Sequence, residues 1–137
     1  MITERQCFTT VVGCITVVTV ARLASGSSPH TTLMTACALA QLCAMYGLLF
    51  RSKPATRVSH ISFTALLWIG SVVAHRGTLE WSMILLLAAF TLATRRVLGH
   101  CMFSAARGES GRSGDPVYDL FYVVPLVVAS ARRRPIS

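Results

Sequence analysis

The sequence contains no asparagine and few charged residues, and both shortages restrict what the protein can be. Because an N-x-S/T acceptor site needs asparagine, N-linked glycosylation is excluded. Charged residues make up 13% of the 137 residues and hydrophobic residues 53%, whereas soluble domains carry about 25% charged residues. The length fits one domain. The composition therefore predicts an integral membrane protein.

Lysine is nearly absent, because the 13 basic residues are Lys53 and otherwise arginines. The net charge of +8 comes from residues at the ends of apolar runs rather than along one surface. A nucleic-acid interface needs a continuous, solvated basic face. Nucleic acid is therefore not an expected partner.

Acidic residues are also scarce, and apart from Asp119 they lie in loops or near the ends of the apolar runs. They are Glu4, Glu80, Glu109, Asp115 and Asp119. We expect no carboxylate in the core of the transmembrane helices, so an acid–base enzyme or a proton carrier would lack its usual groups. The chain has no G-x-S-x-G turn, glycine-rich phosphate loop or selectivity-filter sequence. No motif specifies a family.

The cysteines form no C-x-x-C pair, and most of them lie within apolar runs. They are Cys7, Cys14, Cys37, Cys43 and Cys101. This spacing indicates neither a zinc site nor thiol redox chemistry, so we expect buried free thiols.

Residues 58–96 form the clearest structural unit, because a short polar link joins two apolar runs. The runs, 58–75 and 78–96, approach the length of about 20 residues that a membrane-spanning helix needs. Thr78 is expected to cap the second helix, with Glu80 in its first turn and Trp81 at the membrane interface. The pattern predicts a transmembrane hairpin.

Residues 31–50 contain no charged residue and are the best single candidate for a transmembrane helix. Ala36, Ala40 and Ala44 recur every four residues and form a stripe where another helix can approach closely. Gln41 lies at the centre of the segment. An amide at mid-bilayer is costly unless it is hydrogen-bonded, so Gln41 is expected to bond a neighbouring helix. The alternative is a polar element of a pore or ligand site.

A first span is expected at residues 7–24, where threonines and a glycine suit helix packing in lipid. Residues 7–21 also fit a cleavable signal peptide, which is the alternative. With the spans at 31–50, 58–75 and 78–96, residues 1–103 are predicted to form an all-α, four-helix transmembrane domain in two hairpins.

Residues 104–137 are expected to contain a flexible basic segment and then an apolar helix over 117–131. A helix of this length spans only about 22 Å, and Pro125 interrupts its hydrogen bonds. We expect an interfacial or partly inserted helix, with a short fifth span as the alternative.

Lysine and arginine are distributed unevenly between the two sides of the four-span arrangement. One side holds Arg5, Arg51, Lys53, Arg57, Arg95, Arg96, Arg107 and Arg112. The other side holds only Arg22 and Arg76. The positive-inside rule then predicts both termini on the cytoplasmic or matrix side of a membrane that the sequence does not specify.

The four histidines stand at the ends of the predicted helices. His60 and His100 lie near the basic side, and His30 and His75 lie near the other side. Facing imidazoles can ligate haem or a metal, yet imidazole also suits the membrane interface. We therefore expect no cofactor, with haem as the alternative.

These features predict a small multi-pass membrane protein that works by helix packing, without catalysis of its own. It would serve as an accessory or assembly subunit or a membrane factor, in contact with lipid and with other subunits or copies of itself. A small channel or transporter is the first alternative, because Gln41 and the histidines can line a path. A membrane enzyme or haem carrier is the second.

Overall fold

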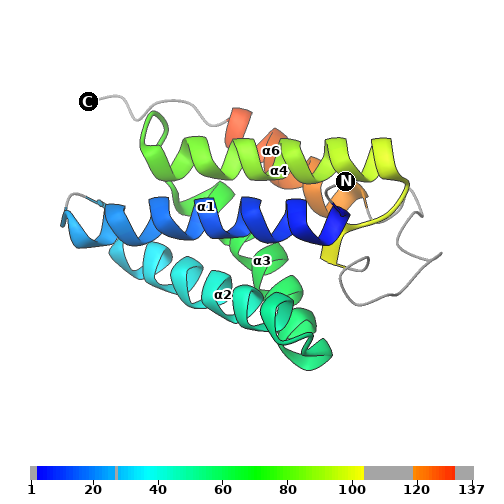
Figure 1. Cartoon of the computed structure of the whole chain (residues 1–137). Helices are drawn as coiled ribbons and strands as arrows, with labels where there is room; N and C mark the ends of the chain where they lie inside the picture. Colours follow the sequence, from blue (N-terminus) through cyan, green and yellow to red (C-terminus); the bar gives the residue numbers. More distant parts are fainter. Residues whose placement is uncertain (1–2, 27, 104–118, 132–137) are drawn as a thin grey trace, which may run out of the picture.

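The computed structural model describes residues 3–26, 28–103 and 119–131, and these residues form helices and links without a strand. The helices are α1 (Glu4–Ala24), α2 (Thr31–Leu49), α3 (Lys53–Val73), α4 (Leu79–Leu98) and α6 (Leu120–Ala131) (Figure 1). The all-α class is therefore confirmed. The expected flexible segment at 104–118 lies outside the described residues.

Local sequence signals set several helix ends. The Thr3 side chain accepts a hydrogen bond from the Gln6 backbone N–H and so begins α1 with a capping box. The Thr78 side chain accepts from the backbone N–H of Trp81, as expected for the start of α4. Gly99 ends α4 with a positive φ of 75°, which a residue without Cβ adopts easily.

The first two helices run in opposite directions, and α2 slants across α1 (Figure 1). Arg5, near the start of α1, donates to the carbonyl of Leu48 near the end of α2, so these helices are antiparallel. α2 packs against α1 and α3, while α4 packs against α3 and α6. α1 and α4 make few contacts with each other. Figure 1 shows α1 and α4 on the same side of the molecule, with α3 behind them.

Two helix backbones approach closely where α2 turns into α3. A Cβ atom at Gly47 would lie 2.8 Å from the backbone nitrogen of Thr56. Real Cβ atoms do not come so near, so only glycine fits at this position. The sequence analysis did not single out Gly47, and the close contact expected at the alanine stripe stays a prediction.

Buried apolar side chains form two clusters. The first joins α1, α2 and residues 101–103, and it contains Phe8, Val12, Ala44, Leu48, Cys101, Met102 and Phe103. The second joins α2, α3, α4 and α6, and it contains Leu33, Leu67, Ala74, Ile84 and Tyr122. α2 contributes to both clusters, so it ties the two halves of the helical body together.

Three helices, α1, α2 and α4, are long and apolar enough to cross a membrane. α3, which covers most of the expected span at 58–75, is not among them. The reason is that α3 begins five residues earlier than expected, so its first turns include Lys53 and Arg57, and His60 adds further polarity. A membrane protein with three candidate spans is supported, and the expected fourth is not established.

α6 lies lengthwise against α4 and antiparallel to it. Asp119, just before α6, bonds Arg95 near the end of α4, and the carbonyl of Ala129 accepts from the Trp81 indole near the start of α4. The start of α6 therefore meets the end of α4, and the end of α6 meets the start of α4. The contacts place α6 against α4 and α3, while the choice between an interfacial helix and a short fifth span stays a prediction.

Candidate functional site

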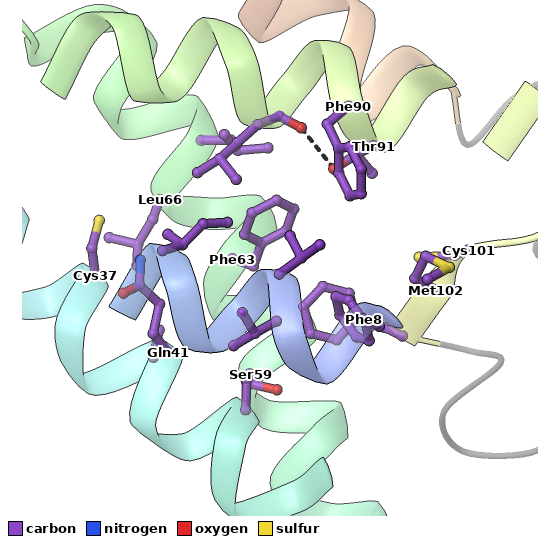
Figure 2. Close-up of a pocket in the computed structure, with 18 of the residues that line it drawn as sticks. Phe8, Cys37, Gln41, Ser59, Phe63, Leu66, Phe90, Thr91, Cys101 and Met102 are labelled. Atoms are coloured by element: carbon purple, nitrogen blue, oxygen red, sulfur yellow. Dashed lines mark hydrogen bonds between the residues drawn. The ribbon is translucent and has the colours of Figure 1, made fainter. Parts of the chain in front are cut away.

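A cavity of about 90 Å³ lies at the centre of the helical body. α1, α2, α3, α4 and the residues after α4 all contribute lining side chains, most of them apolar (Figure 2). They include Phe8, Val12, Ala40, Gln41, Phe63 and Thr91. This cavity is the strongest candidate for a functional site, because it is the place where side chains of four helices converge.

Gln41 supplies an unusual polar group to the lining. Its Oε1 atom is buried and has no hydrogen-bond partner among the residues that the structure describes. The expected bond to a neighbouring helix is therefore not made by this oxygen. An unpaired buried acceptor costs about 1–3 kcal/mol, so Gln41 leaves a hydrogen-bonding capacity unused at the cavity.

The hydroxyl groups of the lining are engaged with the backbone of their own helices. Ser59 donates to the carbonyl of Thr56 at 2.9 Å, and Thr91 donates to that of Leu87 at 2.8 Å. Figure 2 draws the Thr91 bond as a dashed line. Thr94 donates to the Thr91 carbonyl at 2.9 Å. The hydroxyl hydrogens are thus used within the helices, which sets Gln41 apart.

The alanine stripe on α2 faces the interior. Ala44 is buried, Ala40 lines the cavity beside Gln41, and Ala36 is half-buried. Leu39, on another face of α2, is 63% exposed. Ala40 and Ala44 of the stripe therefore contribute small side chains to the cavity wall.

The structure brings one pair of histidines together. The rings of His30 and His75 lie 4.5 Å apart between centroids, and His30 Nε2 accepts a hydrogen bond from the His75 backbone N–H at 3.0 Å. This bond engages Nε2 of His30.

The other two histidines have different partners. His60 Nε2 lies 3.3 Å from the Tyr122 hydroxyl, and its ring stacks on Phe103. His100 Nε2 lies 2.9 Å from Glu4 Oε2. Within the described residues, no three histidine, cysteine or acidic side chains gather in a group suited to a metal ion.

Glu80 lies at a helix end, as expected, yet its side chain is buried, which the sequence analysis did not anticipate. Its side chain is 1% exposed, and its Oε1 accepts from Arg22 Nε at 3.1 Å and from the Ser28 hydroxyl at 2.7 Å. The sequence places Glu80 in a first turn, which suggests exposure. The fold instead brings the end of α1 and the following loop over it, and their donors compensate the charge.

A second ion pair lies at the opposite end of the bundle. Asp119 Oδ1 is 2.8 Å from Arg95 Nε, and Asp119 Oδ2 is 3.1 Å from Arg96 Nη2. Arg95 and Asp119 are both buried. The two ion pairs therefore join elements that are distant in sequence, one at each end of the helical body.

Comparison of the chain with protein-family models, with curated proteins and with solved structures found no match.

Proposed function

We propose that the chain is a multi-pass membrane protein that acts by helix packing, as an accessory or assembly subunit without catalysis of its own. Both termini of the four-span domain would lie on the cytoplasmic or matrix side, where most of the arginines fall. The surrounding lipid and other membrane-protein subunits, or further copies of the chain, would be its partners.

The observation that carries this proposal is the reversed distribution of polar and apolar side chains. Large apolar residues are exposed on all the described helices, among them Val17, Leu39, Ile69, Leu86 and Val127. Such a surface is costly in water but is favourable against lipid tails or other helices.

The buried polar groups support the same proposal, because they bond one another across elements. Glu80 pairs with Arg22, Asp119 with Arg95, and His60 with Tyr122. Groups used in this way hold helices together and are not positioned around a substrate. A packing role therefore fits them better than catalysis.

Purification from native membranes in a mild detergent tests the proposal. After cross-linking, we expect a defined species well above the 14.8 kDa mass of one chain, containing a fixed partner or further copies. A matched preparation without the tagged chain controls for contaminants. A monomer without a partner would contradict the assembly role.

Two further measurements on the same preparation separate the alternatives. Ion or solute flux in liposomes would favour a channel or transporter, and a Soret absorption band would favour a haem carrier. We expect neither signal from the purified chain.

A further inference from the structure

We propose that the central cavity is a binding site for a small apolar molecule that carries one hydroxyl group. The ligand enters from the lipid between α1 and α4, and its hydroxyl bonds the Gln41 amide. This site is additional to the assembly role, and it does not depend on that role.

The size of the cavity sets the class of ligand. An engineered protein cavity of about 150 Å³ lined by apolar side chains binds benzene. The cavity here, about 90 Å³, is of the same order. It fits a single aromatic ring or a short branched chain, after small side-chain movements, and it is too small for haem, a sterol or a phospholipid.

The polarity of the lining sets the chemistry of the ligand. Most lining side chains are apolar, so the body of the ligand must be apolar as well. Gln41 Oε1 is a buried acceptor without a partner in the described structure. A hydroxyl can donate to this oxygen, and it can also accept from the amide nitrogen if the amide is turned over. A hydroxyl therefore satisfies Gln41 in either orientation.

Water is a poorer occupant than such a molecule. A buried water is held by about three hydrogen bonds. The Ser59, Thr91 and Thr94 hydroxyls already donate to backbone carbonyls, so a water at Gln41 would find few donors and would face apolar surface elsewhere. An apolar ligand with a single hydroxyl matches this lining more closely.

The packing of the helices indicates the route of entry. α1 and α4 both line the cavity, yet they make few contacts with each other. Phe90 of α4 belongs to the lining and is also 38% exposed, so it stands where the cavity approaches the outer surface. In a membrane this seam faces lipid, where an apolar alcohol or phenol is concentrated.

Calorimetric titration of the purified chain in detergent micelles tests the proposal with phenol and toluene. The two molecules have the same number of heavy atoms, and toluene carries a methyl group in place of the hydroxyl. We expect saturable binding of both, and the ratio of phenol affinity to toluene affinity in the original chain is the reference against which a hydrogen bond to Gln41 is measured. Empty micelles provide the correction for partition into detergent.

Two variants locate the binding. Gln41→Leu should lower the ratio of phenol affinity to toluene affinity by about threefold to tenfold, the effect of one net hydrogen bond, while toluene still binds. Ala40→Leu should abolish binding of both ligands, because the larger side chain fills the cavity. Leu39→Ala, at a site that is 63% exposed, is the matched control and should bind as the original chain does.

The outcomes decide the proposal even if one variant fails to fold. The same ratio of phenol affinity to toluene affinity in the original chain and in a folded Gln41→Leu variant would overturn the role of Gln41. Unchanged binding in a folded Ala40→Leu variant would overturn the site itself. If Ala40→Leu does not fold, an unchanged affinity ratio in Gln41→Leu would overturn the proposal, and a lower ratio would support it.

Discussion

The buried carboxylate of Glu80 is stabilised by the side chains that bond it. Its carboxylate is almost fully buried and is bonded by Arg22 and Ser28, while its Oε2 atom has no hydrogen-bond partner in the described residues. Removing one member of a buried ion pair is strongly destabilising, because the other charge is left buried without compensation.

We predict that Arg22→Met lowers the free energy of unfolding by about 3 kcal/mol, the lower end of the range of about 3–5 kcal/mol for buried pairs, because Arg22 is partly exposed. Unfolding in mixed micelles by titration with SDS measures the change. Adding Glu80→Gln to Arg22→Met should recover most of the loss, since the uncompensated charge disappears. Lys53→Met removes the same charge from an exposed side chain and should change stability little.

For single residues, the sequence predicts the structure where the neighbouring residues determine it. The Thr78 cap follows from the residues next to it, and the structure confirms it. The burial of Glu80 depends on Arg22 and Ser28, which are more than fifty positions away, so no pattern around Glu80 indicates it. The requirement for glycine at Gly47 likewise arises only when α3 folds back onto α2.

Among the helices, α6 shows how a proline can be accommodated within an apolar segment. Pro125 has no N–H, so the carbonyl of Phe121, four residues earlier, loses its usual helical donor. The Trp68 indole of α3 donates to that carbonyl at 3.0 Å. The Trp81 indole of α4 donates to the Ala129 carbonyl in the last turn of α6, where helical donors also run out. Two tryptophans from neighbouring helices thus supply donors that α6 itself lacks.

We predict that Trp68→Phe destabilises the protein by about 1 kcal/mol, the usual net contribution of a hydrogen bond. In a Pro125→Ala background the same change should cost less, because the alanine N–H can bond the Phe121 carbonyl. The two single variants and the double variant form a cycle that SDS titration can measure. An equal cost of Trp68→Phe in both backgrounds would show that the indole acts only through packing.

The helices themselves were largely predictable, whereas their contacts were not. The span at 31–50 corresponds closely to α2 because the apolar run has polar residues on both sides. α3 extends five residues before the expected start, because Ser52 caps it and Pro54 suits a first helical turn, so the basic residues join the helix. The lengthwise docking of α6 required the positions of Trp68, Trp81 and Arg95, which lie on other helices.

For the whole molecule, the two ends of the bundle differ in the residues that they bring together. At one end, Glu80 is bonded by Arg22 and Ser28. His30 and His75 are bonded to each other at the same end. His100 and Glu4, and Arg95 and Asp119, meet at the other. If the bundle crosses a membrane, each group lies at one surface. The low charge content alone predicted the membrane class, while the pairing within each group needed the fold.

The side of the membrane that each link faces can be read from single cysteines placed on a background without the native thiols. Ser25 follows α1, Ser52 precedes α3, and Ser130 lies in the last turn of α6. We predict that a membrane-impermeant maleimide labels Ser25→Cys from one side and Ser52→Cys from the other, because α2 runs between them. Labelling of both from the same side would contradict the proposed spans.

A cysteine at Ser130 tests whether α6 crosses the membrane or lies at its surface. Because α6 runs antiparallel to α4 and its last turn lies near Trp81, Ser130 stands at the end of the bundle where α4 begins. We predict that Ser130→Cys is labelled from the same side as Ser25→Cys, as a short fifth span requires. Labelling with Ser52→Cys would instead place α6 at the surface with the basic residues. In that case the lengthwise contact with α4 would have to open in the membrane, and Trp81→Phe would then leave stability unchanged.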